Sequence, residues 1–243
     1  MAAESGPLSQ FTIERLIPLH VGGLDVSFTN SALLMVLTVL LGTVFLLYAM
    51  RSASLVPGRL QSVAEMIFEM VDGLVKEHVG PEGRPYLPFL FTLFMFVLLG
   101  NLLGMVPWSF TFTSHIIVTF ALAATVFIGV TLIGIFRHGF KFLALFVPHG
   151  VPGPLLMLLV PIEMLSYLIR PFTLAIRLFA NMMAGHTMLI IFAGFVTSLG
   201  LFGFLPIGMD IFLVLLEFLV AALQAYVFLI LSCLYLKDAI HLH

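Results

Sequence analysis

Residues 155–199 read LLMLLVPIEMLSYLIRPFTLAIRLFANMMAGHTMLIIFAGFVTSL, a long apolar stretch with few charged side chains. An upright helix needs about 20 residues to cross a bilayer, so this stretch is roughly twice the necessary length. We expect either one steeply tilted helix or a helix that breaks into two. Pro161 and Pro171 are candidate kinks, because proline removes a backbone hydrogen bond from a helix.

The whole chain has the composition of a membrane protein. Of its 243 residues, 61% are hydrophobic and only 9% are charged, whereas about 25% of residues are charged in soluble domains. No stretch alternates as the strands of an outer-membrane barrel do. The single cysteine, Cys233, excludes an internal disulfide and a multi-thiolate metal site. The sequence predicts an all-α membrane protein without a metal or cofactor, and no basic stretch indicates nucleic-acid binding.

We expect a single membrane domain with about five transmembrane spans after an N-terminal segment over residues 1–28. The spans are predicted at residues 31–50, 88–106, 115–136, 155–199 and 206–236. The last two spans exceed the length of an upright crossing. They therefore predict a long, strongly inclined antiparallel hairpin that turns near residue 201. An inclined hairpin presents a long side surface, which suits packing against a ring of other helices.

Residues 59–78 are predicted to form an amphipathic surface helix instead of a span. Apolar residues recur there at helical spacing, and charged residues fill the remaining positions. The polar face is more acidic than basic, which favours a protein partner over attraction to anionic lipid. A solvated linker helix is the alternative interpretation.

Basic residues in the loops predict the orientation of the chain. Lys and Arg lie between the first and second spans, between the third and fourth, and after the fifth. The alternate loops, 107–114 and 200–205, contain neither. We therefore expect a cytoplasmic C-terminus and an N-terminus outside, with Arg15 as the exception to the rule.

Arg177 is the strongest candidate for a functional residue. It lies in the middle of the stretch 155–199, where a cationic side chain costs about 2.5–3.5 kcal/mol even on mild insertion scales. Guanidinium stays protonated at any biological pH. Arg177 can therefore hold a fixed charge in the membrane but cannot transfer a proton.

Polar residues form one stripe on each of the last two spans, with a spacing of seven residues that returns to nearly the same helix face. The stripes consist of Glu163, Arg170 and Arg177 on the fourth span and of Asp210, Glu217 and Gln224 on the fifth. With a turn near residue 201, Arg177 is expected beside Gln224, and His186 beside Glu217.

We interpret the stripes as two offset proton half-channels. The first leads inward from outside past Asp210, Glu217 and His186, because carboxylates and imidazole exchange protons; Asn181 and Gln224 lie near its inner end. The second leads past Arg170 to Glu163 on the cytoplasmic side. Arg177 separates them. It would also attract a carboxylate on a moving partner and lower the pKa of that carboxyl group by about 1–3 units.

Each of these residues also has a structural interpretation. Glu163 can pair with an arginine for assembly, and Arg170 can extend to the interface. Asp210 can be a solvated boundary residue. Asn181 and Gln224 can join helices by hydrogen bonds, and His186 with Glu217 can be a static pair. For the whole chain, a stand-alone proton-coupled secondary transporter is the alternative, although the internal repeat common in such folds is absent.

Four runs of sequence resemble the subunit a family of the F-type ATP synthase membrane sector, F0. The most specific is RLFANMMAGH at residues 177–186, together with LQAYVF at 223–228. VPGRLQ at 56–61 and GNLLGMVP at 100–107 match earlier landmarks of that family. The similarity extends over nearly the whole chain after about residue 28.

The resemblance implies a stator that contacts a rotating ring of c subunits and the peripheral-stalk subunit b. Arg177 corresponds to the family's essential arginine, Asn181 and Gln224 to its conserved amides, and Glu163 to its cytoplasmic-side glutamate. His186 and Glu217 are exchanged relative to many bacterial members, as in mitochondrial-type members. This implies the inner membrane of a bacterium that is related to the mitochondrial lineage. The mitochondrial inner membrane is the alternative location. The chain lacks a G-x-x-x-x-G-K-[ST] loop, so no catalytic site or nucleotide binding of its own is expected.

Overall fold

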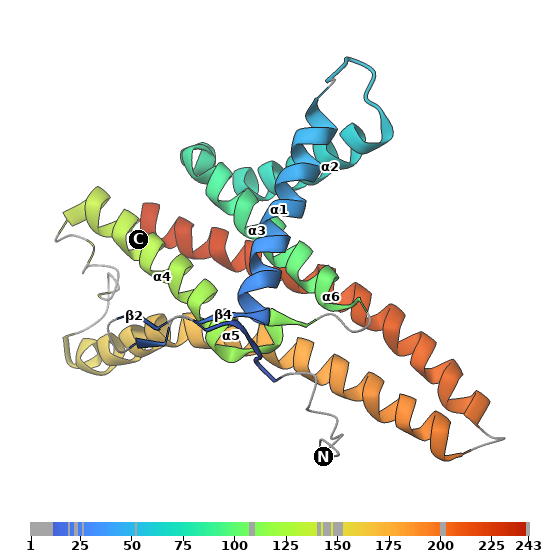
Figure 1. The fold of residues 1–243 in the computed structure, drawn as a ribbon. Helices are drawn as coiled ribbons and strands as arrows, with labels where there is room; N and C mark the ends of the chain where they lie inside the picture. The colour runs from blue at the N-terminus through green and yellow to red at the C-terminus, as the bar shows by residue number, and fades with distance from the viewer. Residues whose placement is uncertain are drawn as a thin grey trace. The chain divides into compact units, whose positions relative to one another are not determined.

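A computed structural model describes residues 12–18, 20–21, 24–25, 27–51, 53–106, 110–139, 142, 147, 153–199 and 203–241. Residues 1–11, 107–109 and 200–202, which belong to the expected N-terminal segment and the two uncharged loops, lie outside this range. The chain is mainly helical (Figure 1). Its α-helices are α1 (Asn30–Met50), α2 (Arg59–His78), α3 (Leu87–Gly104), α4 (Ile116–His138), α5 (Gly153–Ser198) and α6 (Phe204–Ile240).

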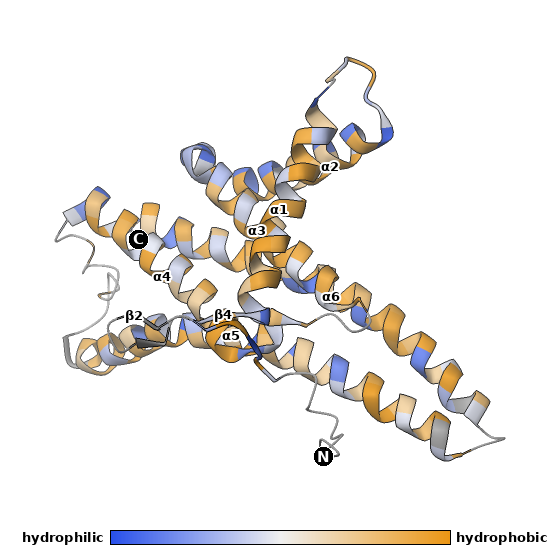
Figure 2. Ribbon diagram, viewed as in Figure 1, coloured by the Kyte–Doolittle hydropathy of each residue, from blue (hydrophilic) through white to orange (hydrophobic). Residues whose placement is uncertain are grey.

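Five helical stretches in the described chain are long and apolar enough to cross a membrane. They are Asn30–Met50, Pro81–Gly104, Ile116–His138, Leu155–Val196 and Pro206–Ile240. Figure 2 shows apolar residues along most of the length of these helices. Helices form here because the bilayer core offers no water, so backbone groups must bond within the segment. The prediction of an all-α membrane protein is confirmed.

Helix α5 passes through both of its prolines without a break. Its 46 residues include Pro161 and Pro171, and the alternative of a fourth span broken into two is therefore wrong. At 1.5 Å per residue, such a helix is about 69 Å long, whereas the hydrocarbon core of a bilayer is about 30 Å thick. Its inclination in the membrane stays a prediction that this length supports.

Helix α2 covers the expected amphipathic segment, but its apolar residues do not share one environment. Val71 and Leu74 are buried, whereas Leu60 and Val63 are 48% and 47% exposed. Gln61 is buried instead, and its amide donates hydrogen bonds to the Ser54 carbonyl and the Glu65 carboxylate. The helix therefore keeps an uncovered apolar strip, as an interfacial helix does.

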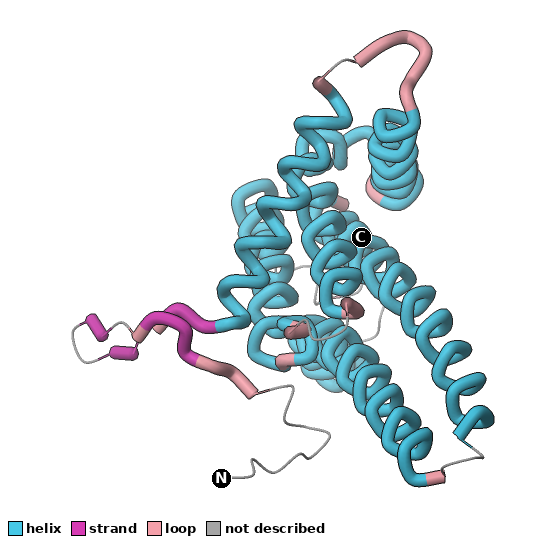
Figure 3. The backbone as a smooth tube through the Cα atoms, turned by 45° about the vertical axis from the view of Figure 1, so that its right-hand side comes forward, coloured by secondary structure: helices cyan, strands magenta, loops and turns pink. Residues whose placement is uncertain are grey.

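Short strands that were not expected from the sequence precede α1. Strand β1 (Arg15–Ile17) pairs antiparallel with β4 (Phe28–Thr29), and β2 (His20–Val21) pairs with β3 (Leu24–Asp25) (Figure 3). Each strand has only two or three residues, too few for a pattern of alternation to be seen in the sequence.

Asn30 connects these strands to the start of α1. Its Oδ1 accepts hydrogen bonds from the backbone N–H groups of Ser31 and Glu14, at 2.9 and 3.3 Å. Its Nδ2 donates to the carbonyl of Thr12 at 3.2 Å. The first N–H groups of a helix lack partners within it. Here Asn30 accepts from the Ser31 N–H, and Thr29 Oγ1 accepts from the Ala32 N–H at 3.3 Å, as a helix cap does.

The chain divides into two compact units. Unit 1 consists of Met1–Tyr48, Met95–Ile116 and Leu178–Ala225; unit 2 consists of Ala49–Phe94, Ile117–Arg177 and Tyr226–His243. In unit 1, residues 178–198 of α5 and 204–225 of α6 run side by side in opposite directions (Figures 1 and 3).

In unit 1, the segment 111–115 packs closely against α3. This segment contains the 3₁₀ helix η3 (Phe112–Ser114). Phe112 is 1% exposed, and its ring occupies the place where a Cβ at Gly100 would lie. Glycine at position 100 therefore allows the segment to pack against α3.

We predict that Asn30→Ala will loosen the paired strands β1 and β4. Loss of a side-chain hydrogen bond costs about 1 kcal/mol, so trypsin should cleave after Arg15, the only Lys or Arg before position 51, about fivefold faster. The control is Thr43→Val, since the Thr43 hydroxyl donates to the Val39 carbonyl of its own helix. Equal cleavage rates in the two variants would show that Asn30 does not hold these strands.

Candidate functional site

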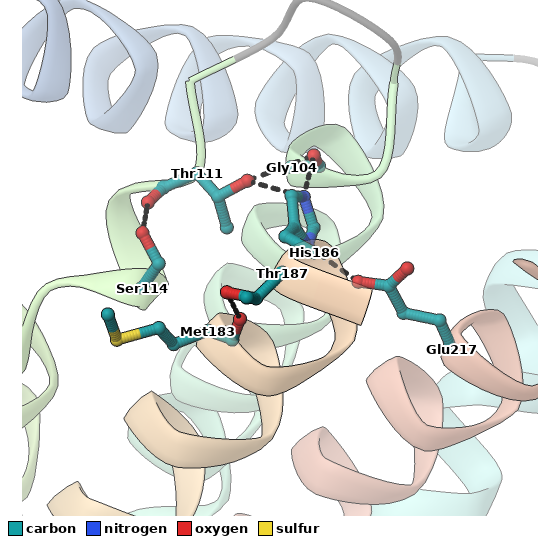
Figure 4. Close-up of polar contacts among 7 residues, drawn as sticks. All are labelled: Gly104, Thr111, Ser114, Met183, His186, Thr187 and Glu217. Atoms are coloured by element: carbon teal, nitrogen blue, oxygen red, sulfur yellow. Dashed lines mark hydrogen bonds and ion pairs between the residues drawn. The ribbon is translucent and has the colours of Figure 1, made fainter. Parts of the chain in front are cut away.

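The centre of the candidate site is a buried contact between α5 and α6 in unit 1. His186 Nδ1 lies 2.5 Å from Glu217 Oε1, and the two side chains are 11% and 5% exposed (Figure 4). At 2.5 Å the imidazole and the carboxylate form a short polar contact. The structure brings these residues together in the register that the sequence predicts.

The other nitrogen of His186 faces two oxygen atoms from outside the hairpin. His186 Nε2 lies 2.8 Å from the Gly104 carbonyl, at the end of α3, and 2.9 Å from Thr111 Oγ1. Thr111 also donates a hydrogen bond to the Gly104 carbonyl at 3.0 Å. The imidazole therefore connects α3 and the segment 111–115 to Glu217 on α6.

Gly185 makes room for the carboxylate beside His186. A Cβ at this position would lie 2.6 Å from Glu217 Oε1 and 2.9 Å from its Cδ, which is closer than van der Waals contact. Glycine therefore allows α6 to bring its carboxylate against α5.

Other polar residues of unit 1 lie on the same helices. Asn101 on α3 is fully buried and donates a hydrogen bond to the Ala221 carbonyl of α6 at 3.2 Å. Gln224 is also buried, and Asn181 and Asp210 are half-buried. Among the described residues, Asp210 Oδ1 has no hydrogen-bond partner. Asn101 was not expected from the sequence as a site residue, although an amide in an apolar span is itself a signal of a polar contact.

His115 lies just before α4, outside the membrane-spanning stretch. Its ring stacks on that of Phe110, with centroids 5.0 Å apart. Burial lowers the pKa of His115, because desolvation disfavours the charged imidazolium. The ring is therefore neutral near pH 7.

In unit 2, Arg170 is held by α6 and by two aromatic rings. Its Nη1 lies 2.7 Å from Asp238 Oδ2. The guanidinium carbon is 5.3 Å from the centroid of Tyr167 and 5.2 Å from that of Tyr235, within the range of a cation–π interaction. Asp238 is not among the candidates expected from the sequence, because it follows the end of the predicted fifth span.

Arg177 differs from Arg170 in its surroundings. It is exposed on α5, and it makes no hydrogen bond or ion pair with another residue of the described chain. Ser166 and Thr173 are exposed on the same helix, and Glu163 is half-buried. Arg177 ends unit 2 and Gln224 belongs to unit 1, so their expected proximity stays a prediction.

The comparisons with known proteins agree on one family. The family model described as "ATP synthase A chain" matches residues 32–237. The chain is 54% identical over 246 residues to ATP synthase subunit a of Paramagnetospirillum magneticum, and the match covers 98% of this chain and 100% of that protein. It is 55% identical over 238 residues to ATP synthase subunit a of Rhodospirillum rubrum, with 98% and 99% coverage. For ATP synthase subunit a of Rhizobium rhizogenes the identity is 54% over 244 residues, with 98% coverage of both chains.

We predict that Gly185→Ala will displace the Glu217 carboxylate and destabilise the protein. Overpacking of this kind costs about 1–3 kcal/mol, against a gain of about 1 kcal/mol from the higher helix propensity of alanine. The melting temperature in detergent should therefore fall below that of Gly194→Ala, where a Cβ meets no atom within 4 Å. Equal melting temperatures would contradict the proposed lack of space at Gly185.

We predict an energetic coupling between Arg170 and Asp238. In a double-mutant cycle with Arg170→Gln and Asp238→Asn, the double variant should be about 1 kcal/mol more stable than the sum of the single changes indicates. Chemical denaturation in mixed micelles gives the four values. Strict additivity would mean that the pair makes no contribution to the folded state.

Proposed function

Because the chain belongs to the ATP synthase A chain family, we propose that it is the proton-translocating stator of the F0 sector of an ATP synthase. Family membership and the apolar helices make it a membrane subunit of that complex, involved in proton transport and ATP synthesis. In the proposed mechanism it loads and unloads carboxyl groups on a rotating ring of c subunits. It has no catalytic site of its own, and ATP is made elsewhere in the complex.

The observation that carries this proposal is the exposed Arg177 on α5. A guanidinium within a span needs a countercharge or water, and no carboxylate of the described chain pairs with it. A carboxylate of a c subunit would supply the missing charge. Ser166, Thr173 and Ala180 are small and exposed on α5, and small residues allow two helices to approach closely.

Two half-channels lead to this position in the proposed mechanism. His186 and Glu217, together with Asp210, carry protons from the outside, because imidazole and carboxyl groups can both bind and release them. Asn181 and Gln224 line the inner end of this half-channel.

The second half-channel leads past Arg170 to Glu163 and the cytoplasm. The ion pair with Asp238 compensates the charge of Arg170, which reduces the electrostatic barrier for a passing proton. Arg177 lies between the half-channels and cannot release its proton, so it prevents a continuous leak. Each proton that crosses a potential of 100 mV releases about 2.3 kcal/mol.

The protein is proposed to lie in a bacterial inner membrane with its N-terminus outside and its C-terminus in the cytoplasm, as the distribution of Lys and Arg indicates. The c-subunit ring and the peripheral-stalk subunit b are the proposed partners. The family match over residues 32–237 favours this function over the stand-alone transporter.

We predict that Arg177→Ala will abolish ATP-driven proton pumping while the complex still assembles, since the barrier and the countercharge are lost together. The measurement is acidification of inverted membrane vesicles, with the amount of assembled complex determined in the same membranes. Arg84→Ala, a change at an exposed residue of the 3₁₀ helix η2 (Pro81–Tyr86), is the control. Normal pumping by Arg177→Ala would refute the proposed mechanism.

A further inference from the structure

The two nitrogens of the His186 ring are held in different ways (Figure 4). Nδ1 faces the Glu217 carboxylate at 2.5 Å. Nε2 faces the Gly104 carbonyl at 2.8 Å and Thr111 Oγ1 at 2.9 Å. Of these three partners, Glu217 carries the carboxyl group.

The Gly104 carbonyl determines which nitrogen of the ring carries hydrogen. A carbonyl oxygen accepts hydrogen bonds and cannot donate them, so the short contact with Nε2 requires a hydrogen on that nitrogen. Thr111 has one hydroxyl hydrogen, which it donates to the Gly104 carbonyl at 3.0 Å. The oxygen of Thr111 is then free to accept from Nε2–H, and each donor in this triangle has an acceptor.

We propose that Thr111 is a positioning residue for proton transfer, which together with the Gly104 carbonyl keeps the hydrogen on His186 Nε2. Nδ1 is then the atom that exchanges a proton with Glu217. In the forward step, the O–H bond of the protonated Glu217 breaks and an Nδ1–H bond forms, which gives imidazolium and carboxylate. The reverse step restores the neutral pair, and the hydrogen on Nε2 stays in place. This inference rests on the proposed function of the pair.

Thr111 is fixed well enough to orient the ring. It is 2% exposed, and the Ser114 hydroxyl donates a hydrogen bond to its carbonyl at 2.6 Å. A Cβ at Gly104 would lie 2.6 Å from Thr111 Cγ2 and 2.9 Å from its Oγ1. Glycine at position 104 therefore lets the Thr111 hydroxyl reach both the carbonyl and the ring. The nearby His115 is neutral near pH 7, because burial lowers its pKa.

Histidines in proton-transfer and metal sites are commonly oriented in this way. The partner of one ring nitrogen sets the tautomer and thereby selects the other nitrogen for chemistry. Without the hydroxyl of Thr111, Nε2–H keeps only the Gly104 carbonyl, and the ring gains freedom to rotate away from Glu217.

The test uses the complete ATP synthase in membrane vesicles, with Thr111→Val and Thr111→Ser compared. A hydrogen bond contributes about 1 kcal/mol, so Thr111→Val should lower proton pumping about fivefold and alter its dependence on the pH of the outer side. Thr111→Ser keeps the hydroxyl and should restore both. Gly104→Ala should reproduce the effect of Thr111→Val.

Thr187→Val is the matched control. Thr187 follows His186, and its hydroxyl donates to the Met183 carbonyl of the same helix at 2.7 Å (Figure 4). This variant makes the same chemical change and should pump at the normal rate. If Thr111→Val and Thr187→Val show the same rate and pH profile, the positioning role is refuted.

Nitrogen-15 solid-state NMR of labelled His186 tests the position of the hydrogen without any variant. A protonated Nε2 at every pH, with Nδ1 as the nitrogen whose signal changes, is the expected result. An unprotonated Nε2 would overturn the inference.

Glu217→Gln separates the two proposals. Normal pumping by this variant would refute the role of the pair in the proposed function. Impaired pumping by Glu217→Gln together with normal pumping by Thr111→Val would overturn the inference alone.

Discussion

A polar side chain in a membrane span must find its partner within protein or at a water-filled path, because the bilayer core contains no water to bind it. Several polar side chains of the described residues follow that rule across helices. His186 contacts Glu217, Asn101 bonds to α6, and Arg170 pairs with Asp238. Arg177 does not, since no residue of the described chain pairs with it. The first three residues therefore join helices within this chain, whereas the charge of Arg177 is left for a group outside it.

The same constraint explains why two arginines seven residues apart on one helix differ. Arg170 has a carboxylate on α6 and two tyrosine rings around it, so its charge is compensated within unit 2. Arg177 keeps an uncompensated charge on an exposed face of α5. A fixed internal ion pair suits assembly, whereas an unpaired guanidinium suits the carboxylate of another chain that the proposed mechanism requires.

Glycines set the distances at the candidate site. Gly185 gives space to Glu217, and Gly104 gives space to Thr111. Both residues lie beside the His186 contacts, so the ring is enclosed by groups that a single methyl group would displace. In apolar spans, where helix association depends on close packing, small residues of this kind determine which polar atoms can meet.

Hydropathy and helical periodicity were sufficient to predict five helices of membrane-spanning length and the helix at residues 59–78, because these depend on local composition and on the 3.6-residue period. The hairpin register also followed from the sequence, since a turn near residue 201 places His186 opposite Glu217. The strands before α1, the ion pair of Arg170 with Asp238 and the contact of Thr111 with His186 did not follow. The strands are too short to show a pattern, and the two contacts join residues 68 and 75 positions apart. The sequence by itself determined which residues are costly to place in a membrane; only the tertiary structure decided which of them meet, because helix packing brings together residues that no spacing along the chain connects.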